Sequence, residues 1–106
     1  MKENNKIEEI QLLEQNLQSL LYQKQAFQME LSETQASKKE IEEAKDDVFK
    51  IVGQLMIKSD KARVLDDLSN KEKLLELRIK AIEKQENSIS ERLEALKEEV
   101  LGKQEK

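Results

Sequence analysis

The sequence predicts a mainly α fold, an antiparallel two-helix coiled coil whose helices are joined by one β-hairpin. The first observation is the composition, with 40% charged and 37% hydrophobic residues and no proline, which is typical of coiled coils and long helices. The second is heptad spacing of apolar residues in both halves of the chain, and the third is one dense apolar run around a glycine between them. With only 3% aromatic residues, the chain of 106 residues offers little material for a wide globular core.

Apolar residues in the first half recur at alternating intervals of three and four, which places them on one narrow seam of a helix. We expect this helix to span about residues 4–45. A few polar residues interrupt the seam, and they can set its register. The seam positions are Ile10, Leu13, Leu17, Leu20, Lys24, Phe27, Leu31, Thr34, Lys38 and Ile41.

The second half repeats this spacing with greater regularity. Ser69-Asn70-Lys71-Glu72 has the Ser-x-x-Glu form of a capping box, and it predicts a helix over about residues 69–102. Asp66 and Asp67 just before it suit the positive end of a helix dipole. The seam positions of this helix are Leu68, Glu72, Leu75, Ile79, Ile82, Glu86, Ile89, Leu93, Leu96 and Val100.

Between the two seams, residues 48–57 are too densely apolar for a heptad and rich in β-branched side chains, which favour extended structure. Gly53 predicts a bulge or a close backbone approach. The turn-forming residues 59–61 and a returning strand at 62–66 complete a hairpin over about residues 47–67, in one domain that covers 1–106. The alternative is that Asp60 caps a helix beginning at Lys61, with residues 48–58 left as a lone loop or strand.

An isolated two-stranded hairpin with two apolar faces is marginal in water and presents open edges. We therefore expect it to pair with strands of other chains and to build a shared sheet or barrel. The hypothesis makes this segment an assembly module. Its predicted assembly residues are Val48, Phe49, Ile51, Val52, Gly53, Leu55, Met56, Ile57 and Val64.

If the chain turns back at the hairpin, both termini reach the far tip of a helical arm. Ile7, Leu12 and Leu101 lie off the seam there, where a partner helix cannot cover them completely. Exposed apolar side chains at a mobile end can hold other apolar chains. A leucine at heptad spacing is more often a seam residue than a binding residue, so the off-seam positions are the better candidates.

The composition argues against several functional classes. Without cysteine or histidine, thiolate nucleophiles, imidazole bases and most zinc sites are excluded, and we predict no catalytic residue, metal or cofactor. A formal net charge of −4 disfavours nucleic acid as a partner. The amino-terminal residues lack an apolar core of signal-peptide length and the apolar run at 51–57 is too short to cross a bilayer, so we expect a cytoplasmic protein without membrane contact.

The run Val48-Phe49-Lys50-Ile51-Val52-Gly53-Gln54-Leu55-Met56-Ile57-Lys58 resembles the hairpin signature of β-type prefoldin subunits. The flanking segments 22–25 and 78–86 resemble the helices of that family. An α-type subunit carries two hairpins between its helices, whereas the segment 47–68 has room for one. The chain therefore resembles the β type, and its length suggests an archaeal source.

The resemblance implies an ATP-independent chaperone of the cytosol, a hexamer of two α-type and four β-type subunits. Their hairpins form a β-barrel body, and the coiled-coil tips hold unfolded client proteins and deliver them to a group II chaperonin. The competing interpretation is a structural coiled-coil scaffold that binds no client. Placed by position at the arm tips, the client-binding candidates are Ile7, Ile10, Leu13, Leu96, Val100 and Leu101.

Overall fold

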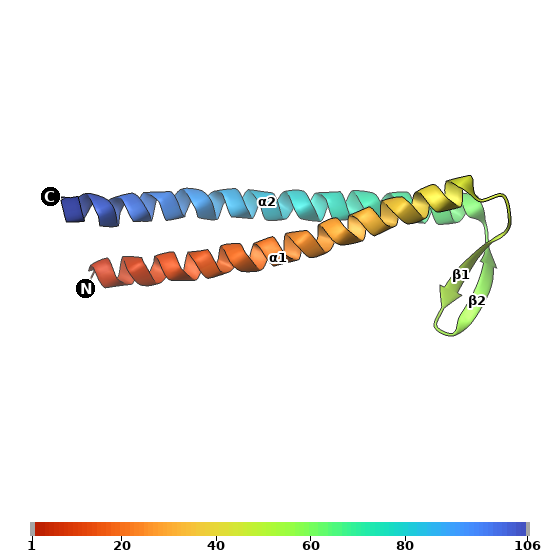
Figure 1. The fold of residues 1–106 in the computed structure, drawn as a ribbon, viewed down its shortest axis with the longest axis horizontal. Helices are drawn as coiled ribbons and strands as arrows, with labels where there is room; N and C mark the ends of the chain where they lie inside the picture. The colour runs from red at the N-terminus through yellow and green to blue at the C-terminus, as the bar shows by residue number, and fades with distance from the viewer. Residues whose placement is uncertain (1, 106) are drawn as a thin grey trace. The chain divides into compact units, whose positions relative to one another are not determined.

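The computed structural model describes residues 2–105, with side chains described for 4–102. Two long helices flank one antiparallel hairpin, which confirms the predicted mainly α fold with a single hairpin (Figure 1). In chain order, the elements are α1 (Lys2–Glu43), β1 (Val48–Val52), β2 (Leu55–Ser59) and α2 (Lys61–Glu105).

The chain forms two compact units, each of which contains parts of both helices. The terminal unit comprises the residues up to Ala26 and those from Ile79 onwards, and the hairpin unit comprises Phe27–Arg78. In each unit, a segment of α1 lies antiparallel to a segment of α2 (Figure 1). The two units are described separately below.

The buried residues are few, as expected for a two-helix pair with a single seam. Ile82, Leu93 and Leu96 are buried in the terminal unit, and Leu75 is buried in the hairpin unit. Thr34 is also buried in the hairpin unit, where its hydroxyl donates a hydrogen bond of 2.8 Å to the Glu30 carbonyl one turn earlier. That bond satisfies the hydroxyl without a partner from the other helix.

Heptad spacing predicts the buried stripe of both helices correctly. All twenty seam positions named above are buried or partly buried, including the polar ones. The off-seam residues Ile7, Leu12 and Leu101 are exposed. The periodic pattern is reliable here because a helix pair with one interface gives its apolar residues only one place to be buried.

The hairpin turns at Gly53 and Gln54, so the expected turn at residues 59–61 and the returning strand at 62–66 are wrong. β1 and β2 pair in the register Val48↔Ser59 through Val52↔Leu55, which leaves a two-residue loop. Gly53 has φ +62° and Gln54 does not have a positive φ, the φ pattern of a type II′ turn. Both strands therefore lie inside the segment that the sequence interpretation assigned mainly to the first strand.

Replacing Gly53 with alanine should destabilise the hairpin through backbone strain alone. A Cβ added at this position has no heavy atom within 4 Å, so no steric clash contributes. The cost expected for a non-glycine residue at this φ is about 1–2 kcal/mol. Thermal unfolding followed by circular dichroism measures it, with Gly53→Asn as the matched control because asparagine tolerates this region better. Equal melting temperatures for the alanine variant and the native chain would contradict the assigned turn.

The second helix begins at Lys61, earlier than the capping box at Ser69 suggests. Asp60 is its N-cap, because Asp60 Oδ1 accepts a hydrogen bond of 3.3 Å from the Ala62 amide. The Asp60 carbonyl accepts the first helical bond, 3.0 Å long, from the Val64 amide. Ser69 lies inside α2, and the alternative in which Asp60 caps the helix is the correct one for this boundary.

Asp60→Ala should lower the free energy of unfolding by about 1 kcal/mol, the typical cost of losing an N-cap side chain. Ser69→Ala is the matched control, since alanine inside a helix is at least as favourable as serine. Urea unfolding of the two variants separates the two assignments. If Ser69→Ala lowers the free energy of unfolding more than Asp60→Ala does, the helix starts at the capping box and not at Lys61.

Lys61 also connects the two helices at the hairpin. Its ammonium group donates hydrogen bonds to the carbonyls of Glu42, at 3.1 Å, and Ala44, at 2.9 Å. The last carbonyls of a helix have no helical partner, and a positive charge there complements the helix dipole. Lys61 therefore caps the end of α1 while it occupies the first position of α2.

Candidate functional site

The hairpin presents apolar side chains on both of its faces. Directly paired residues of an antiparallel sheet share a face and successive residues alternate, so the register assigns each side chain to one face. One face carries Phe49, Ile51, Met56 and Lys58. The other face carries Val48, Lys50, Val52, Leu55, Ile57 and Ser59.

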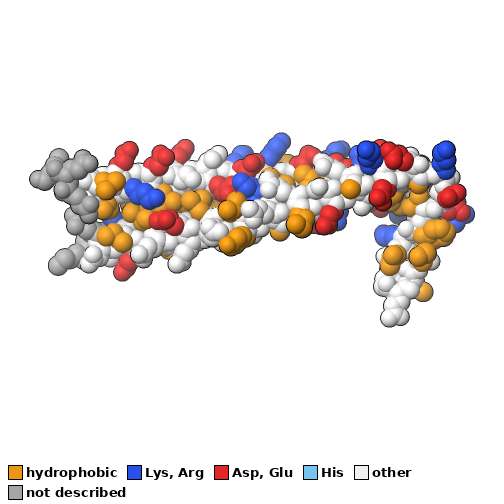
Figure 2. Space-filling model, in the orientation of Figure 1, with side chains coloured by type: hydrophobic (Ala, Val, Ile, Leu, Met, Phe, Trp, Pro, Cys, Tyr) orange, Lys and Arg blue, Asp and Glu red, His pale blue; other side chains and the backbone are white. Residues whose placement is uncertain are grey.

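Most of these apolar side chains are exposed. Ile51 and Met56 are paired across the strands, and they are 71% and 68% exposed. Phe49, Val52, Leu55 and Ile57 are exposed as well, whereas Val48 is partly buried. Figure 2 shows apolar side chains gathered on the hairpin. An apolar surface of this density on a small hairpin is typical of a surface that another chain covers.

Both edges of the hairpin are open in the described part of the chain, where the sheet has two strands. In a two-residue hairpin, the residues that flank the loop exchange both backbone hydrogen bonds, and the pattern then alternates along the strands. The N–H and C=O groups of Phe49 and Ile51 therefore point away from β2. Those of Met56 and Lys58 point away from β1. Each edge can accept a further strand.

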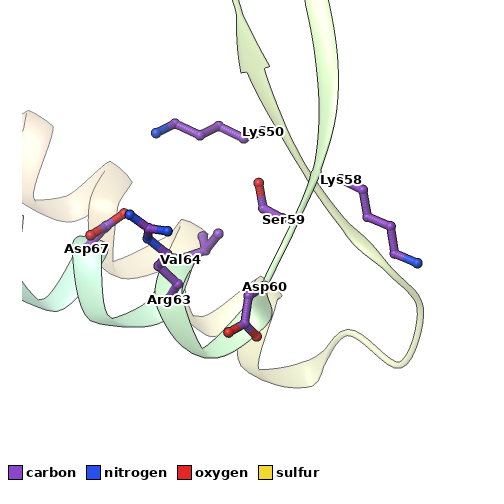
Figure 3. A pocket seen from close by; sticks show the side chains of 7 residues that line it. All are labelled: Lys50, Lys58, Ser59, Asp60, Arg63, Val64 and Asp67. Atoms are coloured by element: carbon purple, nitrogen blue, oxygen red, sulfur yellow. The ribbon is translucent and has the colours of Figure 1, made fainter.

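A shallow cavity of about 310 Å³ lies between the hairpin and the first turns of α2. Figure 3 shows the Lys50 side chain extending toward the side of Arg63 and Asp67, whereas Lys58 extends the opposite way. This agrees with their assignment to opposite faces. Val64 was expected to be a residue of the hairpin, but it belongs to α2, where it is partly buried and lines the cavity. The earlier start of the helix explains this correction.

Lys58 of β2 and Asp47, the residue before β1, form an ion pair of 3.4 Å across the hairpin. Both side chains are more than half exposed, so the pair contributes little to stability. Charged side chains at a sheet edge discourage nonspecific pairing of strands. β1 carries Lys50 as its one charged residue, and that side chain extends toward α2.

In the terminal unit, the predicted client-binding residues fall into three groups. Ile7 and Leu101 are exposed, and Ile10, Leu13 and Val100 are partly buried in the seam. Leu96 is only 1% exposed. In this conformation Leu96 cannot touch another molecule, because contact with it requires the helices to separate. The exposed set is therefore Ile7 and Leu101, together with Leu12, also off the seam.

Two ion pairs outside the named seam positions join the helices in the terminal unit. Lys6 and Glu99 lie 3.0 Å apart, and Arg92 donates to both carboxylate oxygens of Glu9 at 3.2 and 3.5 Å. The charges beside the exposed apolar residues keep that surface from being uniformly apolar. A mixed surface of this kind limits self-association.

Two further ion pairs lie within the seam itself. Lys24 Nζ and Glu86 Oε1 are 2.8 Å apart in the terminal unit, and Lys38 Nζ and Glu72 Oε1 are 3.3 Å apart in the hairpin unit. The hydrogen bond with Glu86 raises the pKa of the Lys24 ammonium above its ordinary value. Glu72 Oε1 is buried, and its contact with Lys38 does not have the geometry of a hydrogen bond.

Four exposed apolar residues on the outer helix faces are not among the predicted binding residues: Tyr22, Met29, Leu74 and Leu77. They lie off the heptad seam, and that position is the signal that could have identified them. The sequence also gives no sign of the role of Lys61. A lysine after a capping aspartate is common, and nothing in the sequence indicates that its side chain bonds to the end of another helix.

Within residues 2–105, no group of three or more acidic side chains is placed to hold a metal ion. No helix in the same range is long and apolar enough to cross a membrane. The features that the described residues do offer are surfaces: the two faces and edges of the hairpin, and the exposed apolar residues of the terminal unit.

Comparison with known proteins gives one consistent family. A family model described as prefoldin subunit matches residues 4–106. The prefoldin subunit beta of Thermococcus onnurineus is 38% identical over 89 residues, which are 82% of this chain and 77% of that protein. The prefoldin subunit beta of Methanothrix thermoacetophila is 37% identical over 98 residues, covering 91% of this chain and 82% of the relative.

Solved structures agree with this result. The crystal structure of the prefoldin beta subunit from Thermococcus strain KS-1 matches with a TM-score of 0.90 and 31% identity, over 95% of this chain and 90% of that one. The prefoldin beta2 subunit from the same strain has a TM-score of 0.70 at 16% identity, which shows the fold alone. With two helices, one hairpin and these relatives, the chain belongs to the prefoldin subunit family of chaperones, as a β-type member.

Proposed function

We propose that this chain is a β-type subunit of an ATP-independent chaperone that holds unfolded proteins. In the proposed complex, four copies assemble with two α-type prefoldin subunits. The hairpins contribute strands to a shared β-barrel body. The observation that carries the proposal is the hairpin with two apolar faces and two open edges, on a chain whose family is established.

The hairpin supports assembly because a lone two-stranded hairpin is marginal in water. Pairing its edges satisfies the outward N–H and C=O groups of Phe49, Ile51, Met56 and Lys58. Closing a barrel also buries one apolar face of the hairpin, and a barrel leaves no open edge. Each gain requires strands from other chains, since the described part of this chain has only these two.

Client binding is assigned to the exposed apolar residues of the terminal unit, Ile7, Leu12 and Leu101, with Ile10, Leu13 and Val100 at their margin. These exposed side chains offer little apolar area, so a single copy of the chain binds an unfolded client weakly. Several patches in one complex bind the same client much more strongly, because each later contact is intramolecular. Binding of this kind needs neither nucleotide nor catalytic residues, and we propose that the chain is not an enzyme.

Delivery of the client to a group II chaperonin in the cytoplasm completes the proposal. Its support is the family to which the chain belongs. Release can proceed by replacement of one weak contact after another, because no single contact dominates a multivalent complex. Nucleic acid and membrane have no part in this mechanism.

The test is light scattering from a denatured client that is diluted into buffer without ATP, in the presence of this chain co-assembled with an α-type prefoldin subunit. We expect the complex to suppress scattering. The triple variant Ile7→Ser/Leu12→Ser/Leu101→Ser should lose most of that suppression while it still assembles. Leu74→Ser/Leu77→Ser is the matched control, because it removes two exposed leucines of the hairpin unit.

The outcomes test both client binding and the residues assigned to it. Suppression that the triple variant loses and the control keeps supports client binding through the terminal unit. No suppression by a correctly assembled native complex would favour the structural scaffold. Equal suppression by all variants would remove Ile7, Leu12 and Leu101 from the client-binding surface.

A further inference from the structure

We propose that the two ion pairs in the seam, Lys24–Glu86 and Lys38–Glu72, determine which helices pair when several copies of this chain are held together. They favour pairing of α1 with α2 and disfavour pairing of α1 with α1 or α2 with α2 from a second copy. This role differs from client binding and from hairpin assembly, and it can be tested without either.

Each pair joins side chains that lie within the seam rather than on the outer faces. The side chains of Lys24 and Glu86 are 19% and 18% exposed, with 2.8 Å between their charged atoms. Lys38 and Glu72 are likewise partly buried, 3.3 Å apart. A partly buried charge that loses its partner is costly, because it keeps its desolvation penalty without the compensating attraction.

The signs of the charges are segregated between the helices. From Ile10 to Ile41, the polar seam positions of α1 are two lysines and one threonine. From Leu68 to Val100, the polar seam positions of α2 are two glutamates. Pairing α1 with α1 therefore offers its seam lysines no seam carboxylate in any register. Pairing α2 with α2 likewise offers its seam glutamates no seam cation.

The spacing also selects one register for the α1–α2 pair. Lys24 and Lys38 are separated by the same number of residues as Glu72 and Glu86, so both contacts form together in antiparallel helices. A shift by one heptad would place Lys24 opposite Ile79 or Leu93 and leave the charges without partners. Polar residues at isolated seam positions commonly specify register and partner in coiled coils at some cost in stability.

Charge reversal in the full chain tests the proposal by redirecting the pairing. The first variant is Lys24→Glu/Lys38→Glu, whose seam contains only carboxylates. The second is Glu72→Lys/Glu86→Lys, whose seam contains only ammonium groups. Each variant alone has like charges facing each other within the chain. In a mixture, each seam of one variant is complementary to both seams of the other, so α1 can pair with α1. When two α1 helices pair in parallel, residues 24 and 38 meet their counterparts and the two residues at position 20 face each other.

The readout is a disulfide between chains, formed by Leu20→Cys introduced into α1 of every variant, because the native chain has no cysteine. We expect the mixture to give roughly tenfold more crosslinked heterodimer than either variant alone, consistent with the couplings measured for close charge pairs. The chain that carries all four reversals should behave like the native seam, with little crosslinking, since its own helices are complementary again.

The matched control makes the same number of reversals at exposed positions, Lys39→Glu/Lys45→Glu in one chain and Glu76→Lys/Glu94→Lys in the other. Its mixture should show no increase in heterodimer. The proposal is overturned if the seam mixture crosslinks no more than the separate variants, or if the exposed control crosslinks equally well. Neither result depends on client binding.

Discussion

Replacing Ile51 with glutamate and Met56 with lysine should leave a folded chain that no longer assembles with an α-type prefoldin subunit. The two residues are paired across the strands, so opposite charges there preserve a favourable cross-strand contact. The apolar area that a neighbouring chain would cover is removed at the same time. Burial of one such side chain contributes about 1.5–3 kcal/mol, so losing two weakens association by at least about a hundredfold.

Analytical ultracentrifugation of the mixed subunits measures the association, and circular dichroism verifies that the helices remain. Leu77→Glu is the matched control, because Leu77 is 65% exposed, close to the exposure of Ile51 and Met56, but lies on α2. The control should assemble normally. If the hairpin variant assembles as well as the native chain does, the hairpin face that carries Ile51 and Met56 is not the assembly surface.

Leu96→Ala should destabilise the terminal unit more than any single change at its exposed positions. Leu96 is among the most completely buried side chains of the described residues, and a buried leucine replaced by alanine typically costs about 2–5 kcal/mol. That is a large part of the stability of a small protein. Urea unfolding measures the loss. Hydrogen exchange of the amides around Leu93 should show where the unit opens.

Leu101→Ala provides the comparison, since Leu101 is 57% exposed and its loss should change stability by less than about 0.5 kcal/mol. The two residues were predicted together as client contacts, and the pair of variants separates them. Leu101→Ala should weaken client binding in a stable protein, whereas Leu96→Ala should act through stability. Similar stability for both variants would mean that Leu96 is less confined than its burial indicates.

The helical part of the fold was predictable because one physical rule decides it. A helix that buries a single narrow stripe must repeat its apolar residues every three or four positions, and Leu75, Ile82 and Leu93 follow that rule. The polar positions in the stripe also followed it. Lys24 and Lys38 lie in the seam because each meets a glutamate from the other helix at the same level.

The boundaries of the hairpin were harder to predict because two local signals competed. Gly53-Gln54 between two apolar runs is the signal of a two-residue turn, but the density of apolar residues on both sides also favours a single strand with a bulge. The Ser-x-x-Glu pattern at Ser69 then moved the start of the helix several residues too far. Capping boxes also occur by chance inside helices, and the sequence alone does not reveal that the Asp60 carboxylate accepts the Ala62 amide.

The predicted binding residues illustrate another limit. Position near the chain ends put Ile7, Leu96 and Leu101 in one set, but only the path of the helices separates a buried leucine from an exposed one. Heptad phase already distinguished them, since Leu96 lies on the seam and Ile7 and Leu101 lie off it. Heptad phase, and not position near the chain ends, therefore separates Leu96 from the exposed residues.

The hydrogen bonds from Lys61 to the end of α1 fix the point at which the hairpin joins the two helices. Because the side chain at the start of α2 holds the Glu42 and Ala44 carbonyls, the chain leaves and rejoins the helical pair at one anchored point. The residues between Ala44 and Lys61 can then be replaced as a unit. Lengthening the strands or substituting another hairpin costs little extra loop entropy and leaves the phase of the two helices unaltered.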